Sequence, residues 1–307
     1  MRIQQLIKLI NRASAFWVVF FLLIGLLLAT RSLNQSSIST PIIYRPNYLF
    51  TAAVAHIIFI NLICAIWARL LKNITGHKTS HRQSFSQIST MAIGKYIPGK
   101  IWGIMARGSE LQKDGLTVHN YIGAVFLEQY LFLLGCLILV STSAPWLIFQ
   151  DTHLAFVATI VPLEIVTAFY CQKICFNIFN KITKHRHSTQ PQIGLPAFAA
   201  YGIGYAFLWA VAGLVFYGLL LATTPISPSW SVLIQSINAS AIGVATGFIA
   251  IFAPGGIGVR EGAITSLMAP AIGIGYAAQI SISYRIFTTI SDLICGGITL
   301  FISLKRR

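Results

Sequence analysis

The sequence predicts an all-α integral membrane protein, a polytopic bundle of about seven or eight transmembrane helices with one or two broken or re-entrant segments. Hydrophobic residues make up 56% of the chain, and charged residues make up only 9%. The mean hydropathy is +0.74. Soluble domains carry about 25% charged residues, so this composition excludes that class. No polar connection is long enough for an independent domain, and residues 1–307 are expected to form a single membrane domain.

The first expected span covers residues 13–30 and follows Arg2, Lys8 and Arg12. Its apolar run is longer than a signal-peptide core, which predicts an uncleaved anchor. Because positive flanks stay in the cytoplasm, the N-terminus is predicted to be cytoplasmic. A second span at 48–71 returns the chain to that side.

The next region, 88–107, is expected to be a broken segment in the first half of the chain. It is too charged to cross a bilayer and too apolar to be a free loop, which favours a re-entrant or interfacial hairpin. Pro98 and Gly99 interrupt any helix there. The surrounding loop is the most basic part of the sequence, with Lys78, Arg82, Lys95, Lys100, Arg107 and Lys113.

Further spans are expected at 121–142, 154–170, 197–222 and 232–252. The connections 143–152 and 223–231 carry no lysine or arginine, whereas 173–186 is basic. This alternation follows the positive-inside rule and explains the net charge of +15 without nucleic-acid binding.

The end of the chain is predicted to return to the cytoplasm. The segment 277–302 is a full span followed by three basic residues. The segment 262–276 is short, rich in glycine and interrupted by Pro270. A cytoplasmic C-terminus after a span at 232–252 requires 262–276 to cross, so a crossing is expected here.

A second broken segment is expected at 253–270, in the second half of the chain. It contains four helix-breaking residues followed by two opposite charges, Arg260 and Glu261. The breakers are Pro254, Gly255, Gly256 and Gly258. Charges at membrane depth are costly and therefore indicate function by default. A broken helix that carries them indicates a polar pathway or a headgroup site.

The two broken segments resemble each other, which suggests an internal repeat. Residues 98–101 and 254–257 share the pattern Pro-Gly-x-Ile, and an arginine and a glutamate follow each copy. Interrupted segments at corresponding places in two halves are typical of a transporter binding site. The alternative is chance, because Pro-Gly is common in turns.

We therefore expect these segments to bind a lipid headgroup and to line its path. The candidate residues are Lys95, Lys100, Arg107, Arg260 and Glu261. Broken helices leave free N–H groups whose dipoles favour anions, and an anionic lipid headgroup is the natural partner. The alternative for each cation is that it only sets the topology.

Three further ionisable residues, Glu128, Arg285 and Asp292, fall inside expected spans and are candidates for protonatable or paired groups. Glu128 is the most isolated of them. Arg260 with Glu261, and Arg285 with Asp292, are expected to compensate each other. Static ion pairs that fix helix packing are the alternative role.

Other site types are not expected. His77 and His81, like His185 and His187, lack the carboxylate or thiol that would complete a metal site. Residues 94–101 match a phosphate-binding loop except that Ile101 replaces the hydroxyl that holds magnesium, so ATP hydrolysis is not expected. We expect no catalytic residues, no metal and no cofactor. Ala239, Gly243 and Gly247 recur at four-residue spacing and predict a face for close helix packing.

In residues 94–103 and 254–262 the sequence resembles the transmembrane region of lysylphosphatidylglycerol synthases, a flippase-like family of bacterial and archaeal membrane proteins. The resemblance covers essentially the whole chain and implies a location in the cytoplasmic membrane. It also implies that the protein moves a lipid between leaflets during envelope biogenesis. The lipid partner would be anionic or linked to a polyprenyl or other phosphate.

In the full synthases a soluble C-terminal domain makes the lipid, and no such domain is expected after 277–302. We therefore expect no enzyme activity. The alternative function is a non-transporting scaffold for a glycosyltransferase or another envelope-biosynthesis enzyme.

Overall fold

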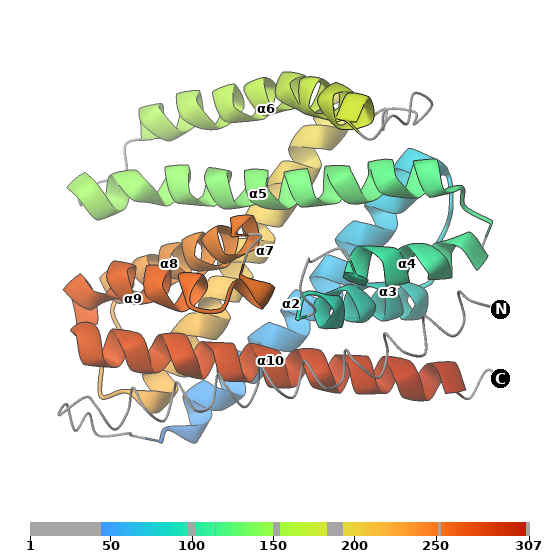
Figure 1. Cartoon of the computed structure of the whole chain (residues 1–307). Coiled ribbons are helices and arrows are strands. Elements are labelled where there is room, and N and C mark those ends of the chain that lie inside the picture. The colour runs from blue at the N-terminus through green and yellow to red at the C-terminus, as the bar shows by residue number, and fades with distance from the viewer. Residues whose placement is uncertain are drawn as a thin grey trace.

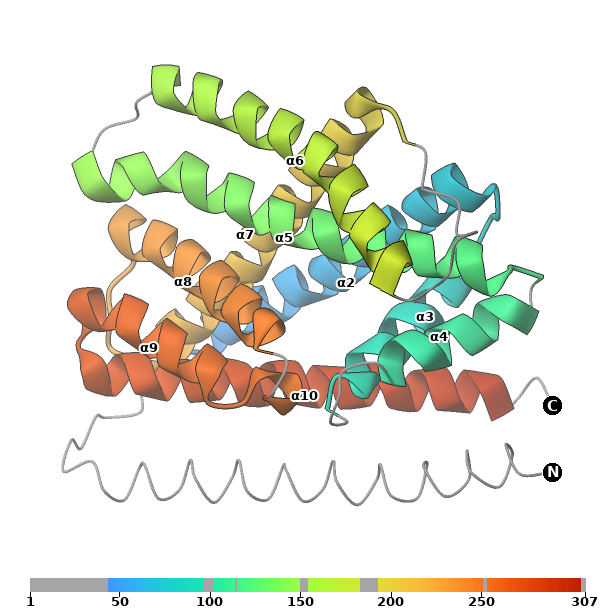
Figure 2. The ribbon, with the colours of Figure 1, turned by 45° about the horizontal axis from the view of Figure 1, so that its top comes forward.

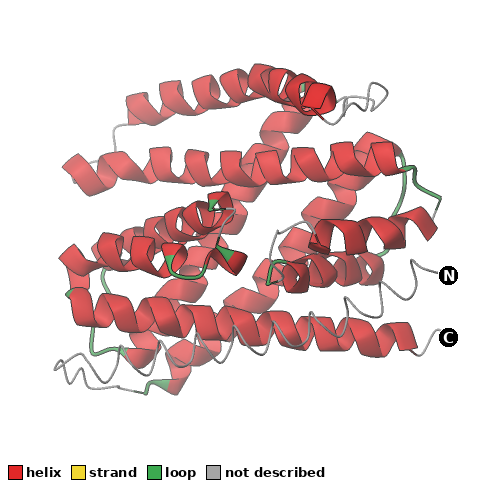
Figure 3. Cartoon of the chain, viewed as in Figure 1, coloured by secondary structure: helices red, strands yellow, loops and turns green. Residues whose placement is uncertain are grey.

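The computed structural model describes residues 44–96, 102–113, 115–149, 154–182, 193–250 and 253–304. Within these ranges every regular element is a helix and there is no strand (Figure 3). The predicted all-α membrane bundle is confirmed. The expected first span at 13–30 lies outside the described residues.

Five long helices run the length of the bundle (Figure 1). They are α2 (Pro46–Thr75), α5 (Val118–Phe149), α6 (Leu154–Ile182), α7 (Leu195–Thr223) and α10 (Ile274–Leu304). At 1.5 Å per residue each is about 44–48 Å long, which exceeds the hydrocarbon thickness of a bilayer. Among the described helices, α2, α5, α6, α7 and α8 are both long and apolar enough to cross a membrane.

Local sequence explains where several helices start and stop. Pro46 lies in the first turn of α2, where a missing N–H costs nothing. Gly76 ends α2 in the left-handed conformation with φ 73°, and its N–H donates to the carbonyl of Lys72 at 2.8 Å. Ser80 and Gln83 then form a capping box that begins the next helix.

Two helical hairpins enter the bundle from opposite ends (Figures 1 and 2). The first consists of α3 (His81–Gly94) and α4 (Trp102–Lys113). The second consists of α8 (Trp230–Ile249), a 3-10 turn at Pro254–Gly256, and α9 (Val259–Ile272). Both tips approach the middle of α10.

Each hairpin closes through a pair of glycines near its tip. A Cβ on Gly103 would lie 3.3 Å from Cα of Gly94, and a Cβ on Gly256 would lie 2.8 Å from Cα of Gly247. Any side chain at these positions would push the two arms apart. The glycines therefore allow a tight reversal inside the bundle.

The structure contradicts the expectation that 262–276 crosses the membrane. At 14 residues, α9 is about 21 Å long, too short for a hydrocarbon core of about 30 Å. It runs back to the end of the bundle where α8 begins (Figure 1). The chain enters the bundle through α8 and leaves it through α9 at the same end. Helix α10 can therefore start at that end without a crossing by α9.

The predicted packing face on α8 is confirmed, and its partner is α9. A Cβ on Gly243 would lie 3.3 Å from the carbonyl oxygen of Arg260. Ala239 is buried in one core cluster with Ile264 of α9. This packing fixes the position of Arg260 relative to the rest of the bundle.

Candidate functional site

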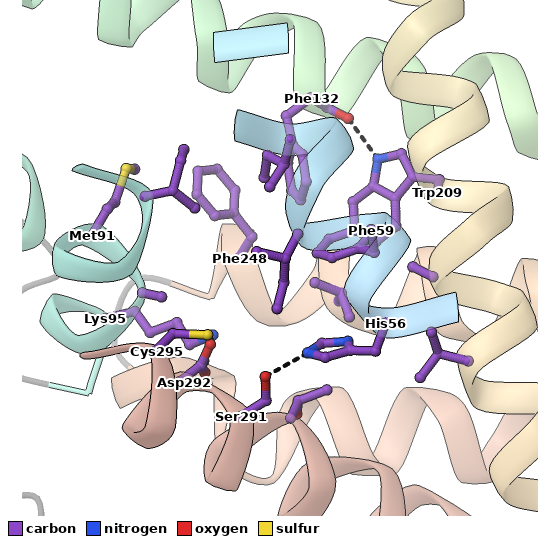
Figure 4. A pocket seen from close by; sticks show the side chains of 18 of the residues that line it. His56, Phe59, Met91, Lys95, Phe132, Trp209, Phe248, Ser291, Asp292 and Cys295 are labelled. Atoms are coloured by element: carbon purple, nitrogen blue, oxygen red, sulfur yellow. Dashed lines mark hydrogen bonds and ion pairs between the residues drawn. The ribbon is translucent and has the colours of Figure 1, made fainter. Parts of the chain in front are cut away.

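A cavity of about 290 Å³ lies at the centre of the bundle, beside the tips of both hairpins. Side chains from α2, α3, α5, α7, α8, α9 and α10 line it. Its walls are of two kinds (Figure 4). Lys95, Asp292, Ser291 and His56 gather on one side, and aromatic rings form the other.

The aromatic wall is held in place by contacts between helices. The Trp209 indole N–H donates to the carbonyl of Phe132 at 2.8 Å, and the two rings lie 4.4 Å apart between centroids. Phe248 meets Phe132 edge to face at 6.2 Å. Such offset and edge contacts give a fixed apolar surface, which suits a hydrocarbon chain.

On the polar side, the tip of the first hairpin is tied to α10. Lys95 Nζ lies 2.6 Å from Oδ2 of Asp292. The Tyr96 hydroxyl donates to the same oxygen at 2.7 Å and lies 3.1 Å from the Thr289 hydroxyl. On the same helix, Ser291 forms a 2.6 Å hydrogen bond with His56.

The tip of the second hairpin is also tied to α10. Gly255 and Gly258 have φ values of 59° and 83°, in the left-handed region that only glycine adopts readily. Arg285 donates to the carbonyl of Gly255 at 2.6 Å and lies 3.8 Å from a carboxylate oxygen of Glu261. The other oxygen of Glu261 accepts from the N–H of Gly258 at 2.7 Å and so caps α9.

The two tips touch each other. A Cβ on Gly255 would lie 3.5 Å from the Tyr96 ring and 3.7 Å from the carbonyl oxygen of Lys95. The guanidinium of Arg285 lies 5.7 Å from the centroid of the same ring. Residues about 160 positions apart in the sequence thus form one polar junction at the middle of α10.

Arg260 lines the cavity from the first turn of α9. It is only 7% exposed, and its guanidinium lies 4.7 Å from the centroid of the Tyr284 ring. In the part of the chain that the structure describes, no carboxylate forms an ion pair with it. Arg260 is therefore a buried cation that lines the cavity.

Arg107 and Glu128 form a buried ion pair beside the cavity. Two guanidinium nitrogens lie 2.8 and 3.2 Å from the two carboxylate oxygens, in a bidentate arrangement. Arg107 also stacks on Trp67, with 3.2 Å from its guanidinium carbon to the ring centroid. Arg107 is fully buried and Glu128 is 3% exposed.

A family comparison matches this architecture. The family model described as "Lysylphosphatidylglycerol synthase TM region" matches residues 2–296. The chain belongs to the lysylphosphatidylglycerol synthase transmembrane-region family. No curated protein matches the chain. This family member is therefore a multi-pass membrane protein, and its family is named for the synthesis of an aminoacylated phospholipid.

In this family member, the candidate residues are distributed differently from what the sequence predicts. Lys95 and Arg260 line the cavity, whereas Glu261 caps α9 and pairs with Arg285. Arg107 forms a buried ion pair with Glu128, so the view of Glu128 as isolated is wrong. Pro98, Gly99 and Lys100 lie outside the described residues.

The expected partners within the charge cluster are also exchanged. Arg285 contacts Glu261, and Asp292 contacts Lys95. The expected pairs were Arg260 with Glu261 and Arg285 with Asp292. Those expected pairs join residues that are adjacent in sequence or lie on one helix. In the structure each ion pair joins two different elements.

Several residues of the site were not predicted from the sequence. His56 is a lone ionisable group in an apolar span, and that signal alone marks it as a candidate. Tyr96, Trp67 and Tyr205 carry no such signal, because aromatic residues are ordinary in membrane helices. Across the described residues, no group of three or more His, Cys, Asp or Glu side chains could hold a metal ion.

Proposed function

We propose that this protein translocates, or helps to translocate, a lipid with an anionic or phosphate-linked headgroup during cell-envelope biogenesis. One observation carries the proposal. The tips of two opposing hairpins meet at a cavity with an aromatic wall on one side and charged residues on the other.

A headgroup that crosses a bilayer unaided must leave water and enter hydrocarbon, which is very costly for a charge. Polar groups fixed at mid-depth lower this barrier because they replace water around the charge. Each hairpin leads from one end of the bundle to the junction at α10 (Figure 2). In this proposal the headgroup follows the hairpins and the acyl or prenyl chain stays against apolar surface.

The proposal assigns no chemical reaction to the protein. The charged side chains at the junction serve in ion pairs, helix capping and headgroup contact. Arg260, the cavity-lining cation without a carboxylate partner, is the residue on which transport depends most.

The test uses purified full-length protein in phosphatidylcholine vesicles. Trace lipids with a fluorescent label are added, one set based on phosphatidylglycerol and one on a prenyl phosphate sugar, and dithionite quenching follows their movement to the outer leaflet. Protein should accelerate movement of at least one of them. Arg260→Gln should slow that movement about tenfold, as expected for loss of a charged hydrogen bond. The exposed control Arg69→Gln should not.

Failure to accelerate either lipid would overturn the proposal. The same variants separate transport from a scaffold role, because a scaffold would keep its cellular function with Arg260→Gln. Substitutions at Gly243 or Gly247 cannot make this distinction. That face packs against α9 and is needed for the fold in either case.

A further inference from the structure

The charges around the cavity leave one cation without a carboxylate partner. Three cations, Lys95, Arg260 and Arg285, lie near the junction of the hairpins. Two carboxylates lie there as well. Asp292 forms an ion pair with Lys95 at 2.6 Å. Glu261 lies 3.8 Å from Arg285. Glu128 also lines the cavity, but Arg107 neutralises it. Among the described residues, one positive charge therefore remains, and it is Arg260.

The buried position of Arg260 makes a nearby anion strongly favourable. A guanidinium stays protonated in proteins, and Arg260 is only 7% exposed. A buried charge without a counter-charge is strongly unfavourable. The face of Tyr284 supplies only partial compensation. An anionic ligand in the cavity would supply the rest.

A second polar group in the cavity also lacks a partner. Tyr205 is fully buried and lines the cavity, and its hydroxyl has no hydrogen-bond partner among the residues that the structure describes. Its ring meets Phe132 edge to face at 6.1 Å, which places it on the aromatic side. Buried hydroxyls are almost always hydrogen-bonded. The Tyr205 hydroxyl is thus an unsatisfied polar group in the wall of the cavity.

The size of the cavity limits the headgroup. At about 290 Å³ it lies at the lower end of the range of about 300–1,000 Å³ that ligand sites occupy. A single phosphate with a small substituent fits this space.

We propose that the cavity binds a lipid headgroup with one phosphodiester charge, held by Arg260, and a small hydroxylated substituent that reaches Tyr205. This deepens the proposed function and rests on it for the role of the cavity. A phosphodiester carries a single negative charge, whereas a pyrophosphate or a phosphomonoester carries more. Two lipid classes share this chemistry: glycerophospholipids with a polyol headgroup, and prenyl phosphates that carry one sugar.

The test measures binding to the full-length protein in phosphatidylcholine nanodiscs. Phosphatidylglycerol and a short-chain prenyl phosphate hexose represent the two lipid classes. Phosphatidylmethanol has the same charge but no hydroxyl group. Phosphatidic acid and a prenyl pyrophosphate carry additional charge. Tight binding of either hydroxylated phosphodiester supports the site, and the tighter of the two identifies the class.

Two variants test the two contacts. Arg260→Gln should weaken binding of every phosphodiester about tenfold. Tyr205→Phe keeps the ring and should weaken phosphatidylglycerol about fivefold, with phosphatidylmethanol unchanged. Tyr201→Phe is the matched control. It removes a hydroxyl one turn away on α7 that accepts from Asn73 at 2.7 Å and lies outside the cavity.

A third variant tests the charge count. Asp292→Asn frees Lys95, so the cavity then presents two positive charges, and its preference should shift toward phosphatidic acid and pyrophosphate by about tenfold. The proposal is overturned if wild-type protein prefers pyrophosphate. It is also overturned if Arg260→Gln binds as wild type does, or if Tyr205→Phe weakens phosphatidylglycerol and phosphatidylmethanol alike.

Binding and transport can fail separately. The expected binding pattern without any lipid movement in vesicles would refute the proposed function and keep the site. Lipid movement that does not depend on Arg260 or Tyr205 would keep the function and refute the site. Circular dichroism melting of each variant verifies that it is folded.

Discussion

At the scale of single residues, the Arg107–Glu128 pair holds the first hairpin against the bundle. Arg107 belongs to α4 and Glu128 to α5, and Trp67 of α2 covers the guanidinium. The indole N–H of Trp67 donates in turn to Gln87 of α3 at 2.7 Å. Four helices thus meet through one charged contact, which makes a static structural role the simplest account of these two charges.

This account predicts the cost of breaking the pair. Glu128→Gln leaves a buried guanidinium without a counter-charge and should lower the free energy of unfolding by about 3–5 kcal/mol. Arg107→Met combined with Glu128→Leu removes both charges and should cost clearly less than the single change. Denaturant unfolding of the purified protein in detergent measures both. Equal stability of Glu128→Gln and wild type would contradict the structural role.

At the scale of elements, the second hairpin depends on the backbone at its tip. Gly255 has φ 59°, and a Cβ there would lie 2.8 Å from Nη2 of Arg285. Gly255→Ala should therefore destabilise the protein by about 1–3 kcal/mol, through backbone strain and displacement of Arg285.

The matched control is Gly262→Ala in α9, where nothing lies within 4 Å of an added Cβ. Because alanine favours helix more than glycine, this change should be neutral or stabilise by up to about 1 kcal/mol. Thermal melting of the two variants compares them directly. Equal effects at both positions would show that the hairpin tip does not require glycine.

At the scale of the whole molecule, the hairpins determine the membrane topology of the chain. The connection between α2 and α3 and the end of α10 lie at one end of the bundle, while the connections between α7 and α8 and between α9 and α10 lie at the other (Figure 1). A reversal at Gly258, rather than a crossing by α9, produces this arrangement.

Thiol labelling of intact cells tests the threading. The five native cysteines are first replaced, and single cysteines are then introduced as Lys78→Cys, Ser227→Cys or Ile274→Cys at exposed positions. Ser227→Cys and Ile274→Cys should react alike with a membrane-impermeant reagent, and Lys78→Cys should react oppositely. A crossing by α9 would instead make Ile274→Cys behave like Lys78→Cys.

The sequence by itself determined the class of the protein, most of the long helices and the two places where helices break. These properties are local. Apolar composition over about 20 residues predicts a span, and proline with glycine interrupts a helix wherever they occur. The family could also be identified from two short motifs, and the match over residues 2–296 confirms it.

Only the tertiary structure decided which charges meet. Lys95 contacts Asp292 of α10, and Arg107 contacts Glu128 of α5, because the first hairpin folds back into the bundle and packs against both helices. In a low-dielectric interior each charge takes the nearest opposite charge in space, whatever its place in the chain. The sequence named Arg260 as a candidate, but no local pattern could have shown that it has no carboxylate partner among the described residues, because that follows from the pairing in space.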